Sequence, residues 1–176
     1  MPRKGEQLER WARENMRGVP TLNSGATYED ADMKVDGVGG RVYEFKSSET
    51  TSGISINRAA ARTLLERAIK LSRDPAFIFQ SSKHERFAVT PLRTLQSAIS
   101  KWDSVGFNPL EVQAIKFAMS TAVMINAKGN NIRIKGEELD HLIDVNGFFL
   151  YKMKNGIVWA ILEADVWLKI VGDRKK

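Results

Sequence analysis

Two carboxylates and a lysine stand within one short, glycine-centred stretch of this chain, at a spacing that suits phosphodiester hydrolysis. Residues 32–46 read DMKVDGVGGRVYEFK, with Asp32 before the glycines and Glu44 and Lys46 after them. If the turn centres near Val38, Asp32 and Glu44 lie opposite each other on two antiparallel strands, with Cβ atoms roughly 4.5–5.5 Å apart. Two like charges so close are unfavourable alone, and a divalent cation between them removes the repulsion. The stretch therefore predicts a metal-dependent phosphodiesterase centre.

The residues around these groups have the pattern of a β-hairpin. The central glycines tolerate positive φ, and the flanking Val, Tyr and Phe residues favour strands. Because side chains alternate along a strand, Glu44 and Lys46 are expected on one face, and Tyr43 and Phe45 on the other. The same alternation also describes any half-solvated hairpin, so the rest of the chain must decide between the two interpretations.

Composition restricts the metal and its ligands. The chain has 176 residues, no cysteine and two histidines, which excludes a thiolate site and disfavours a histidine-rich zinc site. Oxygen ligands suit Mg²⁺, with Mn²⁺ as a substitute. Two further carboxylates compete for the acidic roles. They are Glu6 and Asp30, and Asp30 has the strand parity of Asp32.

Charge and hydropathy indicate the compartment and the kind of partner. The formal net charge of +6 mildly favours a polyanionic partner. No apolar run follows the basic residues near the N-terminus, and no stretch approaches the roughly 18 apolar residues of a membrane span. The chain is therefore expected to be intracellular, in the cytoplasm or nucleoid, with no membrane partner. A cellular and a viral origin both stay open.

The elements that must position the centre alternate in type. Helices are expected over 6–17, 57–72 and 91–102, and strands within 32–46, 76–80 and 87–89, which is a compact α/β order. Residues 47–55 form a polar loop that should be mobile, because little packing is expected to hold it. Beyond residue 103, helices are expected over 109–120 and 164–171, a short helix or turn over 137–143, and strands over 131–135, 148–154 and 157–162.

Several segments, in order, resemble a known family. They are KGEQLE at 4–9, NSGA at 23–26, ADMKV at 31–35, EFKSS at 44–48, ISINR at 54–58 and FIF at 77–79. Together they resemble the archaeal-type Holliday-junction resolvases of the PD-(D/E)XK nuclease superfamily. Ala31 stands where that family has a proline. The resemblance covers about the first hundred residues.

The resemblance implies a fold and a domain organisation. It implies an α/β protein with a restriction-endonuclease-like, PD-(D/E)XK core over residues 1–103, in which helices flank a central mixed β-sheet. Residues 104–176 have no counterpart in the minimal family domain. They are expected to form a C-terminal α+β extension of unknown role, packed on the core.

The resemblance also implies roles for individual residues. Asp32 and Glu44 would bind the metal together with the backbone carbonyl of Phe45, and Glu9 would be an outer ligand. Lys46 would orient the attacking water or stabilise charge on the phosphate. The residues expected to contact DNA are Ser24, Arg10, Arg13, Arg58 and Arg62.

The expected function is a Mg²⁺-dependent, structure-specific DNA endonuclease that resolves four-way (Holliday) junctions as a homodimer. Symmetric cutting of a junction needs two active sites, and twofold symmetry supplies them. Two alternatives stay open. One is another PD-(D/E)XK nuclease, of restriction or repair type, acting on duplex DNA, and the other is a non-catalytic DNA-binding module.

Overall fold

The structure is a computed structural model that describes residues 4–20, 33–34, 40–106, 108–144 and 147–175. These residues form sixteen helices and strands. The first nine are α1 (Lys4–Asn15), β1 (Val19–Pro20), β2 (Met33–Lys34), β3 (Arg41–Ser47), β4 (Ile54–Ile56), α2 (Arg58–Leu71), β5 (Asp74–Gln80), β6 (Arg86–Pro91) and α3 (Leu92–Val105). The remaining seven are α4 (Pro109–Ser120), β7 (Val123–Asn126), β8 (Ile132–Ile134), α5 (Gly136–Asp144), β9 (Phe148–Lys152), β10 (Val158–Glu163) and α6 (Ala164–Val171). No helix within these ranges is long and apolar enough to cross a membrane.

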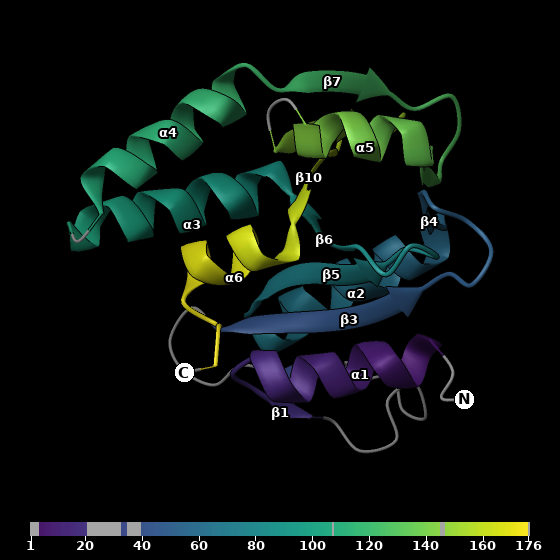
Figure 1. The fold of residues 1–176 in the computed structure, drawn as a ribbon, viewed down its shortest axis with the longest axis horizontal. Coiled ribbons are helices and arrows are strands. Elements are labelled where there is room, and N and C mark those ends of the chain that lie inside the picture. The colour runs from purple at the N-terminus through teal and green to yellow at the C-terminus, as the bar shows by residue number, and fades with distance from the viewer. Residues whose placement is uncertain (1–3, 21–32, 35–39, 107, 145–146, 176) are drawn as a thin grey trace.

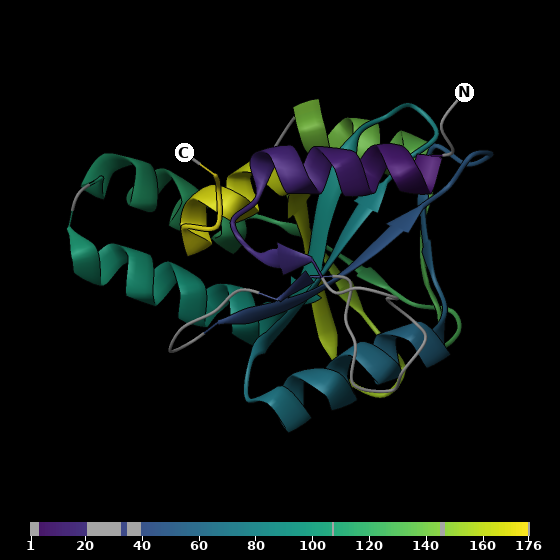
Figure 2. The same ribbon diagram turned by 90° about the horizontal axis from the view of Figure 1, so that it is seen from below.

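Eight of the strands form one mixed sheet, in the order β1-β2-β3-β5-β6-β10-β9-β7, and β4 and β8 form a separate pair. Strand β3 runs parallel to β5 and antiparallel to β2. Helices lie on both faces of the sheet, with α1 and α6 on one side and α2 on the other (Figures 1 and 2). The predicted α/β class, with a mixed central sheet flanked by helices, is confirmed.

The two faces of the sheet bury different side chains, because alternate residues of each strand point to opposite sides. On the face covered by α1 and α6, the buried residues include Leu8, Ala12, Met16, Tyr43, Ile78 and Trp167. On the face covered by α2, they include Val42, Ile54, Leu64, Phe77, Phe79 and Ile134. Strand β3 therefore contributes Tyr43 to the first face and Val42 to the second.

Helix α2 connects the parallel strands β3 and β5, and its ends follow the chemistry of its terminal residues. The side chain of Asn57 accepts a hydrogen bond from the backbone N–H of Ala60 at 2.8 Å and so caps the N-terminus of the helix. At the other end Ser72 adopts a left-handed conformation, with φ of 52°, and closes the last turn.

The loop between β3 and β4 is held more firmly than the sequence predicts. The hydroxyl of Ser48 accepts hydrogen bonds from the backbone N–H groups of Thr50 and Thr51, at 3.3 and 3.0 Å. A Cβ added at Gly53 would lie 2.0 Å from the carbonyl oxygen of Ile134, so the two backbones are in contact there. Gly53 and Ile54 are therefore buried, contrary to the expectation of little packing, because β4 pairs with β8 from the second half of the chain, whereas Glu49, Thr50 and Thr51 are exposed.

Residues 104–176 continue the same sheet. Strand β10 pairs antiparallel with β6 on one side and with β9 on the other, and β7 completes the sheet beside β9. The segment that the resemblance leaves without counterpart therefore supplies three strands of the central sheet.

Asp173, just beyond α6, fastens the end of the fold to β3. Its side chain is fully buried and accepts hydrogen bonds from the Arg41 guanidinium, with Nη2 2.6 Å from Oδ1, and from the Tyr43 hydroxyl. The indole N–H of Trp167 donates to the same hydroxyl at 3.1 Å. The backbone N–H of Arg17 donates to the Asp173 carbonyl at 2.6 Å, so this network also joins the end of α1.

The same network gives stability a dependence on alkaline pH. Burial, together with the charge and hydrogen bond of Asp173, raises the pKa of Tyr43 well above its ordinary value. The stability that neutral Tyr43 contributes is fully present below the pKa of the unfolded chain, about 10, and is lost as pH rises toward the folded-state pKa. Urea unfolding between pH 8 and 11.5 should show this fall, and Tyr43→Phe should show a shallower one. Equal slopes in the two proteins would contradict the assignment.

Candidate metal centre

Strand β3 places Glu44 and Lys46 together on the α2 face of the sheet. The Lys46 ammonium nitrogen lies 3.3 Å from Oε1 of Glu44. The Glu44 side chain is 16% exposed and the Lys46 side chain 40%, so the carboxylate lies deeper than the ammonium. Tyr43 and Phe45 stack on the opposite face, with ring centroids 6.5 Å apart. The predicted alternation along this strand is confirmed.

The second carboxylate oxygen of Glu44 is the least satisfied polar atom of the centre. Oε2 is buried and accepts no hydrogen bond from any residue that the structure describes. A buried carboxylate oxygen without a donor carries a desolvation cost that a bound cation would offset. An anionic oxygen is the donor that Mg²⁺ and Mn²⁺ prefer, so Glu44 fits the predicted metal.

The register of the hairpin agrees with the sequence prediction. Met33 pairs with Tyr43 and Lys34 with Val42, which is the register expected for a turn centred near Val38. Asp32, the proposed second ligand, lies outside the described residues. So do its rival Asp30 and the proposed phosphate contact Ser24.

The proposed outer ligand Glu9 lies elsewhere. It is 48% exposed on α1, and Nη2 of Arg13 lies 3.7 Å from its carboxylate. Helix α1 packs through Leu8 and Ala12 on the sheet face opposite Glu44. The structure thus does not pair Glu9 with Glu44. Within the described ranges, no three acidic, histidine or cysteine side chains lie close enough together to bind a metal ion.

The basic residues proposed for DNA binding divide between two faces. Arg10 and Arg13 are exposed on α1. Arg58 and Arg62 lie in the first two turns of α2, the helix that covers the sheet face carrying Glu44. Nε of Arg62 lies 2.9 Å from a carboxylate oxygen of Glu66. The four arginines therefore cannot form one patch, and the α2 pair lies on the side of the candidate centre.

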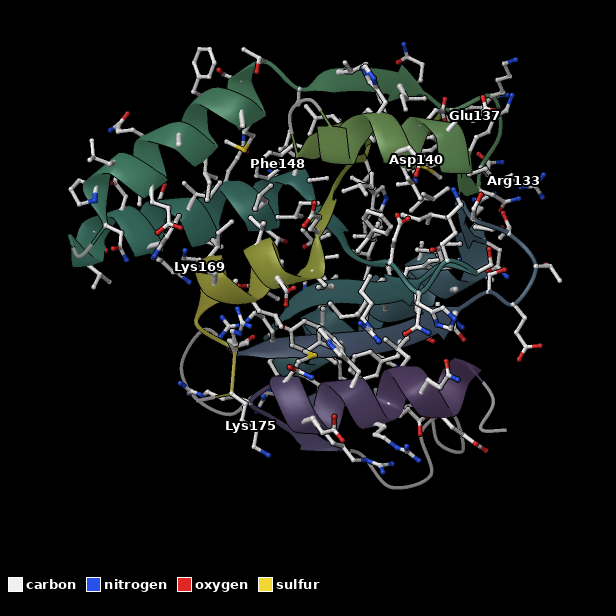
Figure 3. The ribbon with its side chains drawn as sticks, viewed as in Figure 1. Arg133, Glu137, Asp140, Phe148, Lys169 and Lys175 are labelled. Carbon is white, nitrogen blue, oxygen red and sulfur yellow. The ribbon has the colours of Figure 1, made fainter. Side chains whose placement is uncertain are left out.

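The β4–β8 pair adds an arginine that the sequence did not single out. Arg133 stands directly opposite Ser55, and both are exposed, while the isoleucines flanking them are buried against the α2 face. The side chain of Asn131 accepts a hydrogen bond from the backbone N–H of Arg58 at 2.9 Å, which ties this pair to the start of α2. Arg133 lies at the end of the molecule toward which β3 runs (Figures 1 and 3).

A cleft of about 270 Å³ opens on the opposite face, at the side of α1. Its lining residues are Trp11, Glu85, Arg86, Phe87, Glu163, Ala164 and Asp165. The guanidinium carbon of Arg86 lies 4.9 Å from the centre of the Trp11 ring, a cation–π contact that fills part of this space. Burial lowers the pKa of Arg86. This cleft shares no residue with the Glu44–Lys46 pair.

Comparison with known proteins assigns no family to this chain. No protein-family model matches it, and no curated protein matches it.

Proposed function

We propose that this protein is a metal-dependent DNA endonuclease that hydrolyses phosphodiester bonds in branched DNA, with β3 as its catalytic strand. The observation that carries the proposal is the state of Glu44. One carboxylate oxygen lies 3.3 Å from the Lys46 ammonium, while the other is buried without a hydrogen-bond donor among the described residues. A solvated surface ion pair would leave both oxygens in water.

The hairpin register supports a second ligand. Continued by one residue beyond the Met33–Tyr43 pair, it would set Asp32 opposite Glu44. Asp32, Glu44 and the backbone carbonyl of Phe45 would then hold Mg²⁺ or Mn²⁺. The ion would polarise the phosphodiester and lower the pKa of a bound water. Glu9 is the weakest of the proposed ligands, because α1 directs it to Arg13.

Lys46 supplies a positive charge beside the scissile group. Its ammonium is held near Glu44 on one side, and the side chain is 40% exposed, so a phosphate oxygen can reach it. A donor fixed in this way stabilises the negative charge that develops on the phosphate during hydrolysis. Its proton also serves to orient the attacking water.

The fold is consistent with a restriction-endonuclease-like core. Such a core has a mixed sheet flanked by helices, and the sheet of this protein has that form. Paired cuts in a four-way junction require two copies of the site, so we propose a homodimer as the active form.

Cleavage assays test the proposal and separate it from its alternatives. A four-way junction and a duplex of the same sequence are incubated with the protein, with Mg²⁺ and with EDTA. Mg²⁺-dependent cutting of the junction alone supports a resolvase. Cutting of both would favour a restriction- or repair-type nuclease. Binding without cutting would favour the non-catalytic module.

DNA binding should depend on the arginines of the α2 face. Arg58→Ala and Arg133→Ala are each expected to weaken binding to all junction sequences alike, since phosphate contacts carry no sequence information. Each should also reduce the slope of log K against log[salt] by about 0.9, the value for one phosphate on duplex arms. Titrations from low to high salt measure both effects.

Arg93→Ala is the matched control for these two variants. Arg93 is exposed on α3, a helix that packs through Leu95 and Ile99 on the opposite face of the sheet. Its loss changes the net charge by the same amount. If all three variants lose affinity equally, general charge decides binding and the α2 face has no special role.

A further inference from the structure

Helix α4 and strand β7 lie along the upper rim of the molecule in Figure 1 and form a surface that carries little charge. From Pro109 to Ala127 the sequence contains only two charged residues, Glu111 and Lys116. The exposed residues of this surface are Pro109, Leu110, Gln113, Ala114, Phe117, Ser120, Thr121, Val123, Met124 and Asn126, none of which is charged. Leu110 is 86% and Phe117 70% exposed. Exposed apolar side chains that gather on one face mark an interaction surface.

Helix α4 is apolar on both of its sides. Val112, Ile115 and Met119 pack against the hydrophobic core on the sheet face that α1 and α6 cover. The two charges are each neutralised by a neighbouring side chain, since Lys116 pairs with Asp103 at 2.5 Å and Glu111 pairs with Lys169, and both pairs are partly exposed. A helix that is apolar all round is normally buried on all sides. The outer side of α4 therefore has the composition of a covered face.

Strand β7 ends the sheet. It pairs with β9 on one side, and none of the described residues pairs with its other edge. Natural edge strands usually carry a lysine or a proline that blocks pairing with another chain. The opposite edge strand, β1, contains Pro20, whereas β7 reads VMIN and has no such residue.

We propose that the α4–β7 surface binds a second copy of this chain, with the two β7 strands antiparallel across a twofold axis. Two copies of a chain of charge +6 repel each other, and this surface, where the two charges of α4 are paired, is where that repulsion has least effect. A strand paired with its own copy gives the same contacts from both sides, so the assembly closes as a dimer. A nucleic acid would select a basic face instead.

This proposal does not rest on the nuclease proposal. The surface lies beyond residue 103, outside the segment that resembles the resolvases, and it contains none of the residues assigned to the metal or to DNA. Loss of the dimer and loss of cleavage are therefore separate outcomes. A protein that dimerises through α4 and β7 but cuts no DNA would overturn only the nuclease proposal.

Light scattering coupled to gel filtration, at micromolar concentrations, tests the dimer. The wild type should have the mass of two chains. Phe117→Lys and Leu110→Lys should each raise the dissociation constant by about 30-fold or more, the effect of removing a central anchor. The control is Ile69→Lys on α2, where an isolated isoleucine is 79% exposed. A monomeric wild type, or a dimer that survives both α4 substitutions, would overturn the proposal.

Cross-linking provides a second measurement that does not depend on a charged substitution. The chain has no cysteine, so Met124→Cys introduces a single reactive thiol at the edge of β7. A short bismaleimide should convert this variant into a covalent dimer, whereas Ile69→Cys should stay monomeric after the same treatment. If both variants cross-link equally or neither does, the β7 edges do not meet, and the twofold arrangement is wrong.

Discussion

Glu44→Ala should abolish cleavage of a four-way junction and leave binding of that junction intact. The carboxylate is assigned to the metal and not to DNA, and its removal also lessens repulsion of the phosphates. The loss of activity should exceed the roughly 10–100-fold that removing an outer partner of a metal ligand costs. Cleavage under single-turnover conditions and a gel-shift titration of the same preparation measure the two quantities.

Two control variants sharpen this result. Glu49→Ala removes an exposed carboxylate in the loop after β3 and should cleave as the wild type does. Glu44→Gln keeps the shape of the side chain and should be as inactive as the alanine variant. Cleavage retained by either Glu44 variant with Mg²⁺ would exclude Glu44 as a ligand, and the site assignment would fail with it.

The second carboxylate can be located in the same assay. Asp32→Asn should behave as Glu44→Ala does, because the register of β2 and β3 would place Asp32 opposite Glu44. Asp30→Asn should retain activity. The reverse result would show that the pairing shifts by two residues before the described part of β2 begins.

Asp173→Ala should be among the most destabilising substitutions in the chain. Its buried carboxylate accepts hydrogen bonds from Arg41 and Tyr43, and the substitution removes both. Breaking a buried ion pair from one side costs about 3–5 kcal/mol of unfolding free energy. For a chain of this length that corresponds to a melting temperature lower by about 6–20 °C. Urea and thermal unfolding measure the change.

Asp140→Asn provides the comparison. Asp140 is half-exposed and lies 3.4 Å from the Lys83 ammonium, so it has the same kind of partner in a solvated setting. Exposed pairs contribute at most about 1 kcal/mol. Similar losses for the two aspartates would mean that the Asp173 network adds nothing beyond an ordinary surface pair.

Local patterns predicted most of the elements of this fold. The helix over 109–120 and the hairpin around Asn155 and Gly156 lie where the sequence places them, because their signals are contained in a dozen neighbouring residues. The register of β2 and β3 is also local, since the paired residues are no more than ten positions apart in sequence. The pairing of β4 with β8 depends on residues far apart in sequence, and no local pattern of residues 47–55 reports it.

The candidate site likewise has features that local sequence predicts and features that depend on distant residues. Strand parity alone places Glu44 and Lys46 on one face. The burial of Glu44 cannot be read from the hairpin, because it depends on α2 and the β4–β8 pair packing over that face. Arg133 was missed for the same reason, although the alternation of Ile132, Arg133 and Ile134 mirrors that of the strand it joins.

Because β10 lies between β6 and β9 in the sheet, this protein should be most prone to aggregation while it is being synthesised. Strand β6 leaves the ribosome long before β10, and at usual translation speeds its second edge waits roughly 3–13 s for its partner. During that interval the backbone beside Phe87, Ala88 and Val89 is an open apolar edge, the kind that recruits other nascent chains. Aggregation in the cell should therefore be governed by chaperone capacity and translation rate more than by the melting temperature of the finished protein.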